Sequence, residues 1–281
     1  MERFARACLI VNAASGSNTP ETCDALRAGL QAHGIALTRE LAVSDDPLPD
    51  PEALTAEGID LVAIYTGDGT LRSALDRLQG WGGAVLVLPG GTTNLLSKAL
   101  HDDRPLAEIL ADLPRMARKR RQILTSPAGI AVIEVLAGPG AKWSDVREEL
   151  RAGDVGAVAA TAVEAVQASA SGATVLLRQP DIGRADGYPG IRLTPFADGI
   201  DAEGYGAETI AEYLAQGIAL LRRDFRSGPH DDLGRHPVVH CTSSDGAGIE
   251  LMLDGERACG PAELRFSLAE LAVDLLTSRN G

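Results

Sequence analysis

The sequence predicts an α/β protein with two domains, an N-terminal doubly wound parallel-sheet domain (1–121) and a C-terminal, mainly antiparallel, β-sandwich-like domain with helices (122–281). Up to about residue 120, short apolar runs alternate with helical periods, as in a parallel sheet whose strands are joined by helices. Beyond that point, shorter apolar runs separated by turn residues are typical of antiparallel strands. Aromatic residues are only 4 % of the chain, so the core is expected to consist of aliphatic side chains, which suit buried parallel strands. A return of the last segment to the first domain is left open.

The first domain is predicted to begin with a strand, a helix and a second strand. The run Ala7–Asn12 is apolar and ends in a polar turn, as a buried strand does. Thr19 and Pro20 are a helix start signal for Glu21–Gln31, because threonine caps a helix and proline suits its first turn. The later elements are a strand at Ile35–Leu41, a short helix near Glu52–Glu57, a strand at Asp60–Tyr65, a helix at Leu71–Leu78, a strand at Ala84–Leu88 and a helix that ends near Leu100.

The second domain is predicted to contain short strands and two helices. Two strands are expected around Pro127, within Ile123–Leu136. Helical periods cover Trp143–Ser169 and Ala207–Arg223. The remaining strands are expected at Thr174–Leu177, Ile191–Leu193, Val238–Cys241, Ile249–Leu253 and Glu263–Phe266. Between the two domains, the basic run 115–121 is expected to be a solvated helix end and connector, with docking on lipid headgroups as the alternative.

Charge and cysteine content restrict the class of protein. A formal net charge of −13 disfavours nonspecific binding to nucleic acid and to anionic membranes, because both are polyanions. The four cysteines form no C-x-x-C pair, so neither a zinc site nor a disulfide framework is expected. No signal peptide and no apolar run of bilayer length is visible. We therefore expect a cytoplasmic protein with no transmembrane segment and no nucleic-acid partner, at most peripheral to a membrane, and leave open whether it forms a homodimer.

The loop Thr66-Gly67-Asp68-Gly69-Thr70 is the first candidate site. It follows a buried strand directly and precedes a helix. Its two glycines allow a polyphosphate to approach the backbone closely, and backbone N–H groups at the start of the following helix supply positive potential. A carboxylate repels phosphate, so Asp68 is expected to reach a magnesium ion or a basic side chain. The alternative is an ordinary Asp-Gly turn.

Two further loops of small polar residues follow neighbouring strands. One is Asn12-Ala13-Ala14-Ser15-Gly16, and the other is Pro89-Gly90-Gly91-Thr92-Thr93-Asn94. The carboxyl ends of parallel strands meet at one edge of the sheet, where ligands of such folds bind. The patterns G-x-x-x-x-G-K-[ST] and G-x-G-x-x-G are absent, which disfavours a Walker-type or dinucleotide site. Three such loops on one edge favour a phosphate-binding site of another kind.

These motifs resemble those of the diacylglycerol kinase catalytic-domain family, whose fold is related to that of NAD kinases. T-G-D-G-T resembles the family's G-G-D-G-T signature, and residues 12–16 and 89–94 resemble its N-P-x-S-G and P-x-G-T-x-N loops. The segment Leu37-Thr38-Arg39-Glu40 is similar to a short Thr-Glu segment of the family. Near the other end, Leu253-Asp254-Gly255-Glu256 resembles the D-G-E element that the family contributes from its second domain.

The resemblance implies a set of site residues. It places Glu256 as the base that deprotonates a substrate hydroxyl, with Asp254 beside it and Asp68 acting through metal and phosphate. It suggests a second metal at Asp198, within Asp198-Gly199-Ile200, although an Asp-Gly turn is the more common explanation of that pattern. The residues that it places at the nucleotide are Asn12, Ser15, Gly16, Thr38, Thr66, Gly67, Asp68, Gly69, Thr70, Gly91, Thr92 and Asn94.

The function that the resemblance implies is an ATP- and Mg²⁺-dependent lipid kinase, which transfers the γ-phosphoryl group to a hydroxyl of a diacylglycerol-like or sphingoid-like lipid. Such an enzyme serves lipid metabolism, including phospholipid biosynthesis. Thr66, Arg72 and Leu95 depart from the family pattern. Those departures motivate one alternative, a catalytically weak or inactive homologue that binds nucleotide or lipid. A second alternative is an enzyme like the NAD kinases, which acts on a soluble substrate.

Overall fold

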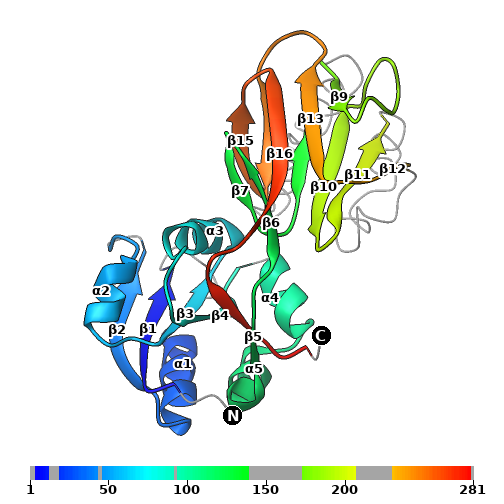
Figure 1. The fold of residues 1–281 in the computed structure, drawn as a ribbon. Helices are drawn as coiled ribbons and strands as arrows, with labels where there is room; N and C mark the ends of the chain where they lie inside the picture. Colours follow the sequence, from blue (N-terminus) through cyan, green and yellow to red (C-terminus); the bar gives the residue numbers. More distant parts are fainter. Residues whose placement is uncertain are drawn as a thin grey trace, which may run out of the picture. The chain divides into compact units, whose positions relative to one another are not determined.

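A computed structural model of the chain describes residues 4–12, 19–43, 46–91, 94–138, 173–206 and 230–279. The chain divides into two compact units (Figure 1). The first consists of Met1–Arg121 together with Glu270–Gly281, and the second of Gln122–Ala269. The helices predicted at 143–169 and 207–223 lie outside the described residues.

The first unit contains a six-stranded sheet in the order β2-β1-β3-β4-β17-β5. Its strands are β1 (Arg6–Val11), β2 (Ala36–Ala42), β3 (Leu61–Thr66), β4 (Ala84–Pro89), β5 (Ala117–Lys119) and β17 (Asp274–Thr277). Neighbouring strands from β2 to β17 run parallel, and only the edge strand β5 is antiparallel to its neighbour. The predicted parallel sheet is confirmed.

The helices of this unit are α1 (Pro20–Ala32), α2 (Pro51–Ala56), α3 (Asp68–Arg77), α4 (Leu95–His101) and α5 (Leu106–Asp112), followed by the 3₁₀ turn η1 (Leu113–Arg115). As predicted, the Thr19 hydroxyl caps α1 by accepting the N–H of Thr22, and Pro20 occupies its first turn. α3 begins three residues before the predicted start, at Asp68, because Gly67 is its N-cap residue. Among the described helices, none has both the length and the apolar character needed to cross a bilayer.

Both faces of the first sheet are buried. Alternate residues of its central strands, such as Leu9, Ala63 and Leu86, share one core cluster with α1 and α5. The intervening residues, such as Ile10 and Val62, are equally buried. Figure 1 shows α3 on the face opposite to α1. This double coverage explains why the strands are almost continuously apolar in sequence, and it agrees with the predicted doubly wound fold.

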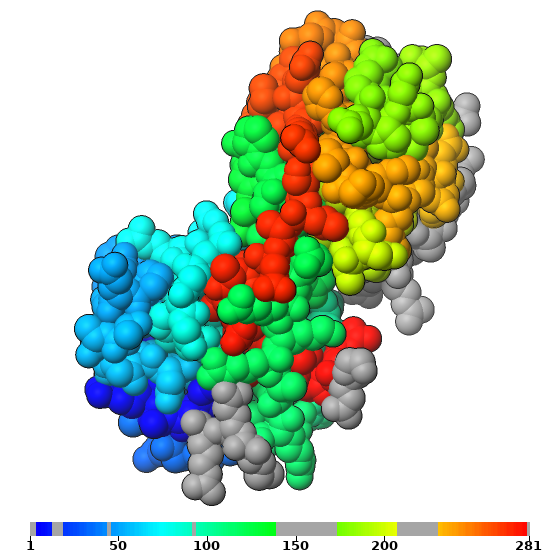
Figure 2. Space-filling view, viewed as in Figure 1, coloured from blue at the N-terminus to red at the C-terminus, as the bar shows by residue number. Residues whose placement is uncertain are grey.

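The basic run 115–121 is not the helix end and connector that we expected. Its middle residues form β5, which pairs with the C-terminal strand β17. In Figure 2 the red C-terminal segment lies against this green segment. Arg118 and Arg120 both contact the carboxylate of Asp274, and Arg120 also contacts Glu270. Carboxylates from the distant end of the chain therefore hold two of these basic side chains, and they tie β17 into the first unit.

The second unit is a sandwich of two sheets. One has the order β12-β11-β10-β8-β14-β15 and the other β7-β6-β16-β13-β9. The strands are β6 (Gln122–Ser126), β7 (Gly129–Ala131), β8 (Val135–Ala137), β9 (Val175–Gln179), β10 (Gly190–Phe196), β11 (Gly199–Tyr205), β12 (Asp231–His236), β13 (Val238–Ser243), β14 (Ile249–Leu253), β15 (Glu256–Gly260) and β16 (Glu263–Glu270). Side chains of both sheets, such as Phe266 and Ile191, share one core. The predicted antiparallel second region is confirmed.

The histidine at the end of α4 should make stability depend on pH. His101 is fully buried, and its Nδ1 lies 3.0 Å from the Ser278 hydroxyl. Burial lowers the pKa of His101 from 6.5 to about 4. Because the unfolded chain binds this proton more readily, the stabilisation is complete above pH 6.5 and is lost as pH falls towards 4. Between pH 7 and pH 5 the free energy of unfolding should fall by about 2 kcal/mol from this residue alone.

Denaturant titration of the wild type and His101→Gln at pH 7 and pH 5 tests this pH dependence of the free energy of unfolding. The variant should lack this component of the pH dependence. Equal pH dependence in both proteins would contradict it.

Candidate active site

Two glycine-containing loops pack against each other at the carboxyl edge of the first sheet. A Cβ atom on Gly90 would lie 2.4 Å from the backbone nitrogen of Thr66, and one on Gly91 would lie 2.7 Å from the Cα atom of Gly67. Real Cβ atoms do not approach backbone atoms so closely. The loops after β3 and β4 therefore meet backbone to backbone, which requires glycine at 90 and 91.

The side chain of Asn94 fixes the shape of the second loop. Its Oδ1 accepts the N–H of Gly91 at 2.7 Å, and its Nδ2 donates to the carbonyl of Gly91 at 2.8 Å. The residue has φ of 53°, a left-handed conformation that asparagine tolerates better than most residues. Asn94 was predicted to contact nucleotide, and its amide group is instead turned towards its own loop.

Asp68 connects the first loop to α4. Its Oδ1 accepts the backbone N–H of Leu95 at 3.0 Å. Leu95 is the first residue of α4, and the N-cap residue of that helix makes no side-chain cap of its own. The carboxylate of Asp68 thus satisfies a donor that the helix leaves open, and it stabilises the loop in which it lies.

A third loop begins beside these two. The Nδ2 atom of Asn12, at the end of β1, donates to the Thr70 hydroxyl in the first turn of α3 at 3.5 Å. Gly67 caps α3 and Gly69 lies in its first turn, so the N-terminus of α3 is at the centre of the predicted site. Ser15, Gly16 and Thr92 lie outside the described residues, and their roles stay predictions.

Two predicted nucleotide contacts need correction. Thr66 is only 2 % exposed, and its hydroxyl donates to the carbonyl of Gly67, so this side chain stabilises the loop from inside. Thr38 lies near the amino end of the sheet, because β2 pairs with β1 in a register that places Ala36 opposite Arg6. It is therefore ~13 Å along the strand from the carboxyl edge. The hydroxyl of Thr38 accepts a hydrogen bond from Arg6.

In the second unit, the D-G-E segment forms a tight hairpin between β14 and β15. Asp254 and Gly255 have φ of 51° and 89°, the two positive values of a two-residue type I′ turn, for which Asp-Gly is a preferred sequence. Leu253 and Glu256 form the pair that closes the turn. Glu256 is exposed at the start of β15, whereas Asp254 is 4 % exposed. The two acidic residues thus have opposite environments.

The carboxylate of Asp254 is used to hold a neighbouring turn. It accepts the backbone N–H groups of Val132 and Ile133 at 2.7 Å and that of Glu134 at 3.0 Å. A buried carboxylate with three such donors stabilises the segment between β7 and β8. This geometry does not favour the predicted proton-transfer role for Asp254, and it assigns the residue a positioning role.

Comparison with known proteins finds a family match for most of the first unit. Residues 6–124 match the family described as the diacylglycerol kinase catalytic domain. This part of the chain therefore resembles that family's catalytic domain. No curated protein matches the sequence closely enough to count as a relative.

Solved structures share the folds of both units of this chain. Three chains assigned as diacylglycerol kinases from Bacillus anthracis str. Sterne are 14–15 % identical to this protein and have TM-scores of 0.65, 0.60 and 0.61. Each alignment covers 99 % of this chain and 98–99 % of the other. At this level of identity the likeness establishes the fold, and the chemistry must be argued from the residues.

The donor set of the first unit would suit a magnesium ion that arrives with a nucleotide. Among the described residues there is no group of three or more His, Cys, Asp or Glu side chains that could hold a metal ion. Magnesium usually binds through one or two carboxylates together with phosphate oxygens and water. The single carboxylate of Asp68 fits this pattern, with no protein cage required.

The second predicted metal position already has a cation beside it. Asp198 lies in the turn between β10 and β11, with its side chain 70 % exposed, and the guanidinium of Arg235 lies 2.7 Å from its carboxylate. The same guanidinium lies 3.5 Å from Asp201. Arg235 also lies over the ring of Phe196. The charge of Asp198 is thus balanced by an arginine, which does not favour the predicted metal.

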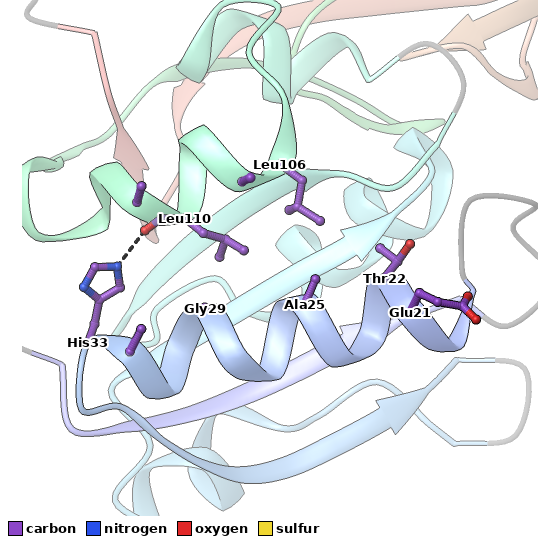
Figure 3. A pocket seen from close by; sticks show the side chains of 10 residues that line it. Glu21, Thr22, Ala25, Gly29, His33, Leu106 and Leu110 are labelled. Carbon is purple, nitrogen blue, oxygen red and sulfur yellow. Dashed lines mark hydrogen bonds between the residues drawn. The ribbon is translucent and has the colours of Figure 1, made fainter.

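An apolar groove lies between α1 and α5 in the first unit. It has a volume of about 590 Å³ and is lined mainly by small residues such as Ala25 and Gly29, with Leu106 and Leu110 opposite (Figure 3). At one end, Nε2 of His33 lies 2.8 Å from the carbonyl of Leu110. None of the residues predicted to bind nucleotide lines this groove.

Proposed function

We propose that the chain is an ATP-dependent lipid kinase, which transfers the γ-phosphoryl group to a hydroxyl of a diacylglycerol-like or sphingoid-like lipid. One observation carries the nucleotide-binding part of the proposal. The loops after β3 and β4 pack so tightly that only glycine fits at 90 and 91, and they meet at the N-terminus of α3. The first N–H groups of α3 have no acceptor within the helix, so an anion can bind them there, as in phosphate-binding loops. The family match supports the kinase part.

The proposed chemistry divides between the two units. Phosphoryl transfer depends on positioning and on neutralisation of charge, which magnesium bound through Asp68 would supply. An alcohol is a weak nucleophile until a base accepts its proton. Glu256 is exposed at the tip of a rigid hairpin and is proposed as that base. Asp254 would act indirectly, because it fixes the turn beside the hairpin.

An assay of phosphoryl transfer tests the proposal. Purified protein with Mg²⁺ and radiolabelled ATP should label diacylglycerol or sphingosine in mixed detergent micelles, and EDTA should abolish the labelling. Parallel reactions should contain NAD, or no acceptor. Labelling of NAD without lipid would contradict the lipid assignment and favour the soluble-substrate alternative. Binding of ATP without transfer to any acceptor would favour an inactive homologue.

A further inference from the structure

α3 carries an arginine whose Nε atom has no hydrogen-bond partner within the part of the chain that the structure describes. Arg72 is half-buried, and its Nε atom is shielded from solvent with no hydrogen-bond partner among the described residues. A buried donor without an acceptor costs stability, and such groups in native proteins call for an explanation. Five other arginines of the described residues are half-buried. Arg39, Arg104, Arg118 and Arg192 each contact a carboxylate, and Arg121 also makes an interaction. Arg72 therefore differs from residues of its own type.

Helix geometry predicts that the side chain of Arg72 leans towards the glycine cradle, which is formed by the loops after β3 and β4. Long side chains on a helix lean towards its N-terminus and cover the residues three and four positions earlier. For Arg72 these are Gly69, which has no side chain to block it, and Asp68. Asp68 has its Oδ1 engaged by the N–H of Leu95. We therefore expect the guanidinium near the N-terminus of α3, where the anion of the proposed function would bind.

We infer that Arg72 donates hydrogen bonds to the polyphosphate of the bound nucleotide, an inference that rests on the proposed function. A guanidinium presents several N–H donors in one plane and pairs with phosphate oxygens at two points, whereas backbone N–H groups each offer one. Arg72 then shares the neutralisation of the nucleotide with the magnesium ion and with the N-terminus of α3.

Calorimetric titration with ATP tests the inference. Arg72→Met keeps an unbranched side chain similar to the aliphatic stem of arginine, and it removes the donors and the charge. Its affinity for ATP in the presence of Mg²⁺ should fall roughly 10- to 100-fold relative to wild type, as expected for a lost charge-assisted hydrogen bond. Affinity for tripolyphosphate, which has the phosphates without the nucleoside, should fall by a similar factor.

Arg77→Met is the matched control, since Arg77 lies on the same helix and pairs with Asp50 at the surface. It should bind ATP as wild type does. Because Nε of Arg72 has no acceptor among the residues that the structure describes, Arg72→Met without nucleotide should melt at the wild-type temperature or above it. A lower melting temperature with unchanged ATP affinity would show that Arg72 is only structural.

The possible results distinguish a failure of the role inferred for Arg72 from a failure of the proposed function. If wild type binds ATP and Arg72→Met binds it equally well, the inference fails and the proposed function stands. If ATP binding falls while tripolyphosphate binding does not, Arg72 contacts the nucleoside and the inference is wrong. If wild type binds no ATP, the proposed function fails and takes the role of Arg72 with it.

Discussion

Replacement of Glu256 by glutamine should reduce lipid phosphorylation by ~10²–10⁴-fold, because the amide cannot accept the proton of the attacking hydroxyl. Affinity for ATP should not change, since the nucleotide cradle belongs to the first unit. The melting temperature should not change either, because Glu256 is exposed at the hairpin end. The rate of lipid labelling under saturating ATP and lipid measures the effect. Turnover within tenfold of wild type would remove Glu256 from the mechanism.

Asp254→Ala is the informative comparison, because the two acidic residues are only two positions apart. This variant leaves the backbone N–H groups of Val132, Ile133 and Glu134 without their carboxylate. Unsatisfied buried donors should lower the free energy of unfolding by on the order of 3 kcal/mol. A loss of stability in Asp254→Ala but not in Glu256→Gln would separate positioning from proton transfer. Equal stability of both variants would contradict the role that we assign to Asp254.

Gly90→Ala should impair both stability and nucleotide binding. The added Cβ atom would lie 2.4 Å from backbone atoms of Thr66 and Tyr65, which cannot move aside as a flexible side chain can. The loops after β3 and β4 must then separate, at a cost of roughly 1–3 kcal/mol or more. Because the cradle loses its shape, affinity for Mg·ATP should fall at least tenfold, measured by calorimetry.

Gly82→Ala is the matched control for this substitution. Nothing lies within 4 Å of a Cβ atom at Gly82, and its φ is not in the left-handed range. This variant should therefore bind ATP normally and melt at the wild-type temperature. If Gly90→Ala behaves in the same way as Gly82→Ala, the close packing of the loops has no role in binding.

The sequence alone predicted those helices and strands whose own residues show a clear apolar or capping pattern. Apolar runs with turn residues at both ends predicted β1, β3 and β4, and the pair Thr19-Pro20 predicted the start of α1. The order of these elements was enough to predict a parallel sheet, because helices between strands require crossover connections. The glycine loops were predicted for the same reason, since they lie at strand ends that must share one edge.

Elements that depend on distant partners were not predictable. β5 is a three-residue strand with the sequence Ala-Arg-Lys, and it exists because β17 pairs with it from the other end of the chain. β12 begins with two aspartates, which look like a loop until β11 pairs with them. Short charged strands have no apolar period, so periodicity cannot find them.

Roles in the candidate site that depend on distant residues were likewise not predictable from the sequence. Thr38 was placed at the nucleotide from a short sequence resemblance, but strand register decides which end of the sheet it occupies. The role of Asp254 depends on backbone donors about 120 residues away, which leave no local trace in the sequence. Arg72 was noticed only as a departure from the family pattern. Its unsatisfied Nε could be found only in the structure.

Hydrogen–deuterium exchange with and without saturating Mg·ATP tests most directly whether the glycine cradle binds the nucleotide phosphates. Backbone amides of residues 68–70 should exchange more slowly with nucleotide, because phosphate oxygens would accept hydrogen bonds from the first turn of α3. Peptides from the groove between α1 and α5, such as residues 25–33, should not change. Unaltered exchange at 68–70 under saturating Mg·ATP would contradict the account.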